Sequence, residues 1–224
     1  MPKLGIVGGT FNPIHLGHLL MAETALHQLQ LDQVLWVPTY HPPHRSPTDL
    51  AAVSHRVAMI KAAIASHPAF ALSTVNLDRP TPSYAIDLFT ELQQHHPQSQ
   101  WYWILGLDAF QTLPQWYRRH ELVQQCSWLV APRFLTQPDT QATKSMASPT
   151  TPQLCTQVAQ ALLQQNLKIH WQVLHMPLFE VSSSLIRQYR RDAKRFPLGN
   201  NHRSIRYLVP DAVFAYINRE NLYI

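Results

Sequence analysis

The sequence is poor in cysteine, glycine and charged residues, and it has no long hydrophobic run. Its two cysteines, Cys126 and Cys155, stand far apart, without the spacing of a metal site or a redox motif. These absences exclude a disulfide scaffold, and a reduced, cytoplasmic protein is expected. No apolar stretch approaches the roughly 20 residues of a membrane-spanning helix, so no membrane partner is expected. The first residues lead directly into a strand pattern, so no signal peptide is expected.

The composition is otherwise that of a folded protein. Hydrophobic residues make up 46% of the 224 residues and charged residues only 14%, a balance typical of a globular chain. The length suits one domain over residues 1–224. The net charge of +5 fits a protein that handles polyanions. Basic residues become dense from Arg187 onward, but apart from Arg187 we interpret them as a solvated helix face, and no nucleic-acid partner is expected.

Glycine is rare and unevenly placed. Four of the six glycines, Gly5, Gly8, Gly9 and Gly17, fall within the first seventeen residues. Glycine used so sparingly is expected where the backbone turns sharply or a ligand comes close. We therefore expect a tight turn at Gly8 and Gly9, directly after an apolar strand.

Two histidines follow that glycine pair, His15 and His18, at the start of an amphipathic stretch. Free N–H groups at a helix start point toward anions, and the helix dipole favours negative charge there. Both histidines project from one face and can donate hydrogen bonds to phosphate oxygens. The pattern predicts a triphosphate site. The alternatives are a purely structural glycine turn and a histidine pair that binds metal or faces solvent.

Strand-like and helix-like segments alternate along the chain. The alternation predicts an α/β fold with a doubly wound, parallel, Rossmann-like sheet, in which ligands bind beyond the carboxyl ends of the strands. Residues 136–152 lack periodicity and predict a mobile loop, and residues 182–224 are expected to form a small helical C-terminal part. The expected strands are 3–7, 33–37, 69–73, 101–105, 127–130 and 169–174, and the expected helices are 16–29, 50–66, 83–95, 118–125 and 154–167.

Two later segments also suit phosphate. A proline-stiffened loop after the second expected strand carries His44 and Arg45. Further on, the serines at 182–184 open a helix one turn before Arg187. Hydroxyls and free N–H groups at a helix start bind phosphate, and an arginine can hold two of its oxygens. Taken alone, the first is an ordinary surface loop and the second an ordinary serine-capped helix.

In order along the chain, these segments resemble the motifs of one family. The stretch from Gly9 to His18 is similar to the signature of the nucleotidyltransferase superfamily, with Asn12 where aspartate is more usual. The segments 38–45, 79–87, 106–117 and 181–187 resemble motifs of bacterial nicotinate mononucleotide adenylyltransferases. The resemblance covers nearly the whole chain except residues 136–167.

The resemblance implies transfer of the adenylyl group of ATP to nicotinate mononucleotide, giving nicotinate adenine dinucleotide and pyrophosphate in NAD biosynthesis. It implies positioning and charge stabilisation without a general base, and Mg²⁺ that enters with ATP and takes few protein ligands. The implied catalytic residues are His15, His18 and Arg187. The residues implied for ATP and its phosphates are Gly8, Gly9, Thr10, Phe11, Gly17, His44, Arg45, Gly106, Asp108, Arg133, Ser182, Ser183 and Ser184. Those implied for the nicotinate group are Tyr84, Ala85, Trp116 and Tyr117.

Within that set, Trp116 is implied to stack on the pyridine ring, which suits an aromatic face. The backbone N–H groups of Ala85 and Tyr117 are implied to bind the nicotinate carboxylate. Asp108 is implied to contact ribose hydroxyls. Taken alone, without the flanking pattern, Trp116 is better interpreted as a packing residue between helices. Two other functions stay open. One is a phosphopantetheine adenylyltransferase, which shares the first motif, and the other is a nucleotide- or RNA-binding module without chemistry. The sequence also leaves open whether the chain forms a homo-oligomer.

Overall fold

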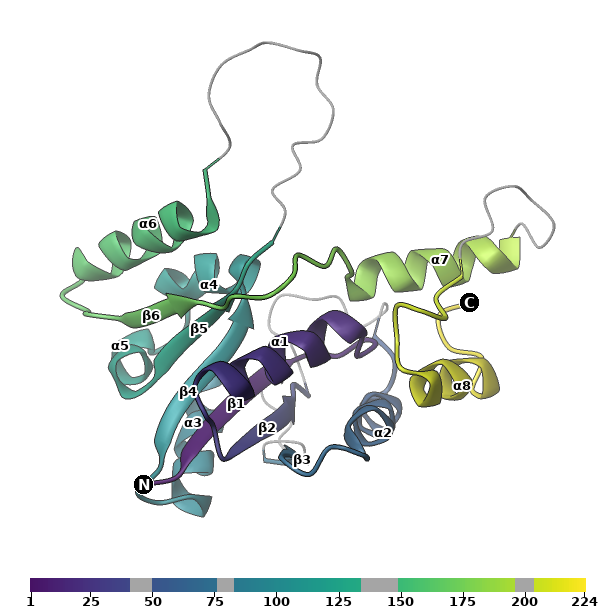
Figure 1. The fold of residues 1–224 in the computed structure, drawn as a ribbon, viewed down its shortest axis with the longest axis horizontal. Helices are drawn as coiled ribbons and strands as arrows, with labels where there is room; N and C mark the ends of the chain where they lie inside the picture. Colours follow the sequence, from purple (N-terminus) through teal and green to yellow (C-terminus); the bar gives the residue numbers. More distant parts are fainter. Residues whose placement is uncertain (41–49, 76–82, 134–148, 196–203) are drawn as a thin grey trace, which may run out of the picture.

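The computed structural model describes residues 1–40, 50–75, 83–133, 149–195 and 204–224, which form an α/β fold around one sheet (Figure 1). The strand order is β3-β2-β1-β4-β5-β6, and every neighbouring pair is parallel. The α/β class and all six expected strands are confirmed. The strands are β1 (Lys3–Gly9), β2 (Gln33–Pro38), β3 (Phe70–Leu72), β4 (Gln100–Gly106), β5 (Ser127–Ala131) and β6 (His170–Val173).

The strand order reverses direction beside β1, which pairs with β2 on one side and β4 on the other. In register, Val7 of β1 lies opposite Trp36 of β2 and Ile104 of β4. The loops that leave the carboxyl ends of β1 and β4 therefore diverge to opposite faces of the sheet. In a doubly wound sheet this switch point is where a ligand binds.

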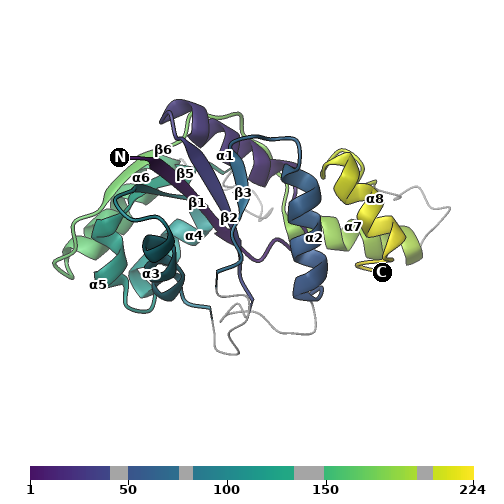
Figure 2. The ribbon, with the colours of Figure 1, turned by 90° about the horizontal axis from the view of Figure 1, so that it is seen from below.

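Helices cover both faces of the sheet, as Figure 2 shows. On one face, α1 and α2 pack over Val7, Trp36 and Ile104, and buried residues of α7 and α8 extend the same core beyond the end of β1. On the other, α3, α4, α5 and α6 pack over Ile6, Trp103 and Trp128. The helices are α1 (Leu16–Gln28), α2 (Val53–Ile64), α3 (Ala85–His95), α4 (Leu107–Thr112), α5 (Arg119–Leu122), α6 (Thr151–Leu163), α7 (Ser183–Arg195) and α8 (Asp211–Arg219), with 3₁₀ turns η2 (Leu113–Gln115) and η3 (Val123–Gln125).

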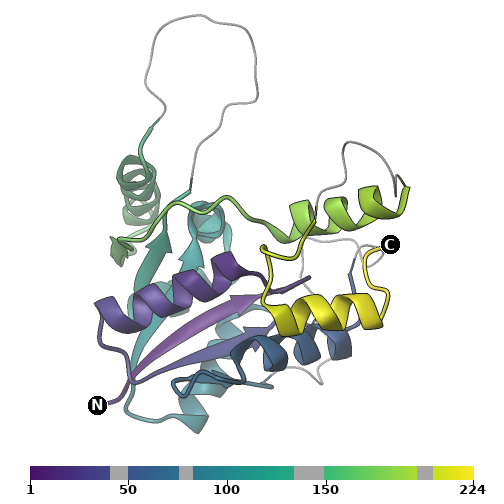
Figure 3. The ribbon, with the colours of Figure 1, turned by 45° about the vertical axis from the view of Figure 1, so that its right-hand side comes forward.

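The C-terminal helices lie beside the carboxyl end of β1 and not over the middle of the sheet. In Figures 1 and 3, α7 runs outward from the sheet, and α8 lies between α7 and α2. His55 of α2 and Tyr216 of α8 share a hydrogen bond of 3.0 Å. The C-terminal residues thus return to the region where the first strand ends. Among the described residues, no helix is both long and apolar enough to cross a membrane.

Several helix bounds differ from the expected ones. The expected helix 50–66 is shorter, Val53–Ile64, and the expected helix 118–125 divides into α5 and η3. The bounds of α6 differ most. Helix α6 begins at Thr151, three residues earlier than expected, and ends at Leu163 instead of 167. Thr150 caps it: its backbone N–H donates to Gln153 Oε1 at 2.7 Å, and its hydroxyl accepts from the Gln153 N–H at 3.5 Å. The end of the expected loop 136–152 is therefore helical, while residues 136–148 of that loop lie outside the described residues.

Candidate active site

The site begins where β1 ends, and its glycines do not turn the chain. Gly8 and Gly9 both lie inside β1, and none of the five described glycines has a positive φ. The prediction of a sharp turn at Gly8 and Gly9 is therefore wrong. The left-handed residue is Phe11, with φ of 48°. Its buried ring lies 5.2 Å from the ring of His18 and 5.6 Å from that of Trp36, so packing stabilises a backbone conformation that bulky residues avoid.

Gly9 makes room for that ring. A Cβ on Gly9 would lie 3.3 Å from the Phe11 ring, which is tighter than an ordinary contact. Gly17, in the first turn of α1, is more restricted, because a Cβ there would lie 2.8 Å from Val181 Cγ1 and 3.2 Å from His15 Nδ1. These two glycines are explained by close packing around the histidines.

The two histidines form a stacked pair at the N-terminus of α1. Their ring centroids are 3.6 Å apart, with 24° between the planes. His15 is the N-cap residue, and its backbone N–H donates to Nδ1 of His18 at 3.2 Å. Since Nδ1 of His18 accepts this hydrogen bond, the proton of the neutral ring lies on Nε2. That nitrogen is the donor left for a ligand.

Both rings are neutral at pH 7. Burial lowers the pKa of His18 to about 3. Burial also lowers the pKa of His15, and the charges of His18 and Arg133 lower it further. Each ring therefore offers a neutral N–H donor and not a positive charge.

The serine-rich start of α7 lies against the same loop, about 170 residues away in sequence. The Ser183 hydroxyl donates to the Pro13 carbonyl at 2.8 Å, and the Ser182 hydroxyl accepts from the Leu185 N–H at 3.2 Å, capping the helix. These bonds bring the N-terminus of α7 next to the N-terminus of α1. Two positive helix ends thus lie around one loop.

Arg187 lies between these elements and is 9% exposed. Its Nη1 donates to the Asn12 carbonyl at 2.9 Å, and its Nη2 lies 3.4 Å from the Ser184 hydroxyl. In this state the guanidinium therefore binds the protein loop and the α7 start. Residues His44 and Arg45 lie outside the described residues.

The second half of the site lies at the carboxyl ends of β4 and β5. Gly106 ends β4 and is the N-cap residue of α4, with open space where a Cβ would lie. Asp108, in the first turn of α4, forms an ion pair with Arg133, which follows β5. The carboxylate expected for the ribose and the arginine expected for phosphate are therefore partners of each other.

The four nicotinate candidates also gather, at the ends of α3 and η2. Tyr84 is the N-cap residue of α3, Ala85 is its first residue, and the Tyr84 ring lies 4.4 Å from that of Tyr117. Tyr117 is 54% exposed. Ala85 carries one of the first N–H groups of α3, which have no partner inside the helix.

Trp116 packs against buried aromatic rings, and its own side chain is half-buried. Its ring lies edge-on to Trp103 and Trp128, with centroids 6.0 and 5.9 Å away. Its Nε1–H donates to the Thr112 hydroxyl at 2.9 Å. The packing interpretation is therefore correct for one side of this ring, and the hydrogen bond fixes the ring plane.

Arg56 of α2 is a structural residue of the site that sequence reasoning missed. It is 2% exposed, and burial lowers its pKa. Its guanidinium donates to the carbonyls of Thr10 at 2.9 Å, Thr39 at 2.7 Å, Tyr40 at 3.2 Å and Ala51 at 3.1 Å. It thereby ties together the loops that follow β1 and β2. The sequence signal for a buried role of Arg56 was its position on the apolar face of the expected helix 50–66.

Asn12 is the second residue that was underrated. It is 1% exposed, and its Oδ1 accepts hydrogen bonds from the Ala51 N–H and the Tyr223 hydroxyl, each at 3.0 Å. Nothing in the local sequence pointed to Tyr223, which is 211 residues away.

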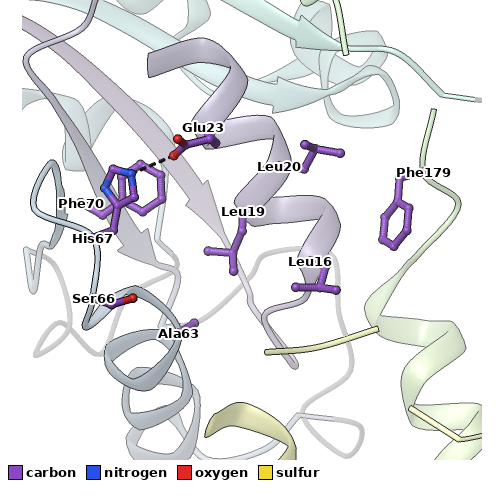
Figure 4. A pocket seen from close by; sticks show the side chains of 9 residues that line it. All are labelled: Leu16, Leu19, Leu20, Glu23, Ala63, Ser66, His67, Phe70 and Phe179. Carbon is purple, nitrogen blue, oxygen red and sulfur yellow. Dashed lines mark ion pairs between the residues drawn. The ribbon is translucent and has the colours of Figure 1, made fainter. Parts of the chain in front are cut away.

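A groove of about 500 Å³ beside α1 is a separate feature (Figure 4). Its walls are mostly apolar, and Glu23 holds His67 at 2.8 Å. His15 and His18 do not line it, so it is not the phosphate site. The lining residues are Leu16, Leu19, Leu20, Glu23, Ala63, Ser66, His67, Phe70 and Phe179.

The described residues contain no group of three or more His, Cys, Asp or Glu side chains arranged to hold a metal. Asp108 is the one carboxylate among the candidate residues, and it is paired with Arg133. These residues fit a divalent metal held mainly by substrate phosphates and water, the arrangement that Mg²⁺ favours.

The chain is similar to known proteins over its whole length. Residues 6–189 match the cytidylyltransferase-like family. A curated relative from Trichormus variabilis, named "Probable nicotinate-nucleotide adenylyltransferase", is 46% identical over 223 residues and covers 100% of this chain and 98% of its own. A relative of the same name from Geobacillus kaustophilus is 34% identical, covering 100% of this chain and 87% of its own.

Solved structures support the fold. The nicotinic acid mononucleotide adenylyltransferase of Plasmodium falciparum, complexed with NaAD, aligns with a TM-score of 0.67 at 18% identity, covering 100% of this chain and 98% of its own. The same protein complexed with APC aligns with a TM-score of 0.68 at 17% identity and the same coverage.

Proposed function

The chain belongs to the cytidylyltransferase-like family, among the nicotinate-nucleotide adenylyltransferases, and from that premise we propose how its residues carry out the reaction. Adenylyl transfer joins a phosphate oxygen of nicotinate mononucleotide to the α-phosphorus of ATP. The bond from that phosphorus to the bridging oxygen breaks, and pyrophosphate leaves with the electron pair. The attacking phosphate is already ionised at neutral pH, so no general base is needed, and catalysis rests on position and charge.

The stacked histidine pair is the observation that carries the assignment of roles. His18 offers its Nε2–H from the start of α1, and we assign it to the α-phosphate, where charge builds up during transfer. His15, the N-terminus of α7 and Arg187 are assigned to the β- and γ-phosphates. Gly8 and Gly9 at the end of β1, Thr10 and Phe11 in the loop that follows, and Gly17 are assigned to supply backbone close to the phosphates. His44 and Arg45 are assigned to the triphosphate by the resemblance alone.

Mg²⁺ is proposed as the divalent metal of this nucleotidyltransferase. It would enter with ATP and neutralise charge on the phosphates, with water and phosphate oxygens as its main ligands. Asp108 is assigned to the ribose. Because it is paired with Arg133 here, nucleotide binding has to share or break that ion pair.

The nicotinate end is assigned to the other face of the sheet. The exposed side of Trp116 stacks on the pyridine ring beside Tyr84, and the backbone N–H groups of Ala85 and Tyr117 bind the carboxylate. We further propose that residues 1–224 act as one domain in the cytoplasm, on ATP and nicotinate mononucleotide, without a nucleic-acid or membrane partner.

The first experiment measures pyrophosphate release from Mg·ATP with nicotinate mononucleotide and nicotinamide mononucleotide in parallel. We expect fast release with the acid and slow release with the amide. Equal rates would remove the carboxylate pocket but keep the reaction. No release with either compound would overturn the function, and phosphopantetheine would be the next acceptor to test.

The second experiment removes His18. We expect His18→Ala to lower kcat by roughly a hundredfold or more while the Kd of ATP changes only a few-fold, because the ring acts on charge that develops in the transition state. His27→Ala is the matched control, since His27 lies on the exposed side of the same helix, 2.8 Å from Glu23. Near-normal turnover in His18→Ala would refute the assignment.

A further inference from the structure

Three segments distant in sequence meet at Asn12. Its side-chain oxygen accepts hydrogen bonds from the Ala51 N–H, just before α2, and from the Tyr223 hydroxyl, after α8, each at 3.0 Å. Its backbone carbonyl accepts from Arg187 Nη1 of α7 at 2.9 Å. Asn12 is 1% exposed, so water does not substitute for these partners. Hydrogen bonds to the side chain and to the backbone of Asn12 therefore both fix its position.

The direction of the Tyr223 hydrogen bond is unambiguous. The Ala51 N–H can only donate, so the Asn12 atom that faces both partners is the oxygen, and the tyrosine hydroxyl is the donor. Tyr223 must remain protonated for this. Burial raises its pKa and outweighs the opposite effect of the nearby Arg187 and Arg56 charges. The hydroxyl is therefore a donor throughout the physiological pH range.

The backbone at Tyr223 is also unusual. Its φ is 65°, in the left-handed region that bulky residues avoid. Such a conformation persists where the surroundings hold it. The hydrogen bond to Asn12 is one interaction that can do so, and it aims the ring back at the loop after β1.

We infer that Tyr223 is a positioning residue for adenylyl transfer, which acts through Asn12 on Arg187 and on the loop that leads into His15. The hydroxyl orients the Asn12 side chain, and Asn12 in turn presents the carbonyl that holds the Arg187 guanidinium. Tyr223 itself is assigned no contact with substrate. The inference rests on the proposed function, because Arg187 is the residue assigned there to the ATP phosphates.

The inference predicts an effect on one substrate only. Asn12 and Arg187 adjoin Phe11 and Ile186 of the core that includes α1 and α2, whereas Trp116 packs against the core on the opposite face of the sheet. Loosening Asn12 should therefore disturb ATP and leave nicotinate mononucleotide nearly untouched. A general loss of structure would affect both substrates together.

The test is Tyr223→Phe in the full chain, which removes one hydroxyl and keeps the ring. We expect kcat/KM for ATP to fall between about tenfold and a hundredfold, with the KM for nicotinate mononucleotide within about twofold. The thermal midpoint should fall by only a few degrees, as for one lost hydrogen bond. Tyr207→Phe is the control, because Tyr207 is 79% exposed.

A double-mutant cycle separates positioning from general stability. If Tyr223 acts through Arg187, then Tyr223→Phe should have little further effect on kcat/KM for ATP in an Arg187→Lys background. Fully additive losses would overturn the inference. So would a Tyr223→Phe protein with unchanged kcat/KM for ATP, or one that loses both substrates equally.

Binding of Mg·ATP, measured by calorimetry without acceptor, keeps the two proposals apart. A wild-type chain that binds ATP but transfers nothing would refute the proposed function. The inference would then stand or fall on whether Tyr223→Phe weakens ATP binding. A wild-type chain that does not bind ATP would overturn both.

Discussion

Adding one methyl group at Gly17 should disturb the histidine pair more than it stabilises the helix. The new Cβ of Gly17→Ala would lie 2.8 Å from Val181 Cγ1 and 3.2 Å from His15 Nδ1. Val181 leads into α7 and is buried, so it cannot rotate away into solvent. The methyl therefore has to displace Val181, His15 or both.

The expected cost follows from two opposed effects. Alanine is favoured over glycine in a helix by about 1 kcal/mol. Overpacking a filled interior costs about 1 to 3 kcal/mol. The net loss of stability is therefore up to about 2 kcal/mol, a fall in thermal midpoint of up to about 8 °C for a chain of this size. A shift of His15 toward 1 Å should lower kcat by up to about a hundredfold.

The assay compares Gly17→Ala with and without Val181→Ala, by thermal unfolding and by pyrophosphate release. Removing Cγ1 of Val181 removes the closest contact, so the two changes should couple by about 0.5 kcal/mol or more. Gly8→Ala is the control for stability, since its methyl would meet only Trp103 at 3.7 Å. A Gly17→Ala protein as stable and active as wild type would refute the reasoning, and so would strictly additive effects.

Three further predictions follow from buried groups. The pKa values of His15 and His18 are lowered in the folded chain, so on acidification the unfolded chain takes up these protons first. The free energy of unfolding should therefore fall as the pH drops below about 6.5. Urea titrations at pH 4 to 7 should show this slope, and His18→Gln should flatten it. Arg56→Met leaves four carbonyls without their donor and should destabilise the fold by about 3 kcal/mol or more; a loss below about 1 kcal/mol would contradict its role. Burial raises the pKa of Cys155 to about 11 and that of Cys126 further, so both thiols should react with a disulfide reagent only after unfolding, and rapid labelling at pH 8 would contradict this.

The sheet was predictable because its strands are buried on both faces. Runs such as 33–37 and 101–105 are nearly all apolar, which is typical of central parallel strands. Helix α4 was not predicted, because its six residues are too few to show a helical period. The early start of α6 carried a readable signal, the threonine and glutamine of a capping box at 150 and 153.

The individual motifs of the site were predictable from the sequence, but the contacts between them were not. The order of motifs placed His15, His18 and the serines at 182–184 near phosphate, and the fold brings all of them to one loop. The prediction of a turn at Gly8 and Gly9 was wrong, because the left-handed backbone conformation lies at Phe11 instead. Burial of the Phe11 ring stabilises that conformation, and no local sequence pattern reveals it. Arg56 was missed because its partners are loop carbonyls from three places in the chain, and its place on the apolar face of helix 50–66 does not identify them.

The parallel order of the sheet also constrains how the chain folds. β1 lies between β2 and β4, so its second edge stays open until residues 100–106 are available, and every neighbouring pair of the six described strands is parallel. Contacts over such separations form slowly, because the entropy of closing long loops is lost before packing compensates for it. The Asn12–Tyr223 hydrogen bond closes a separation of 211 residues and belongs to the latest contacts to form. On refolding from denaturant, recovery of activity should therefore lag behind recovery of helix and sheet.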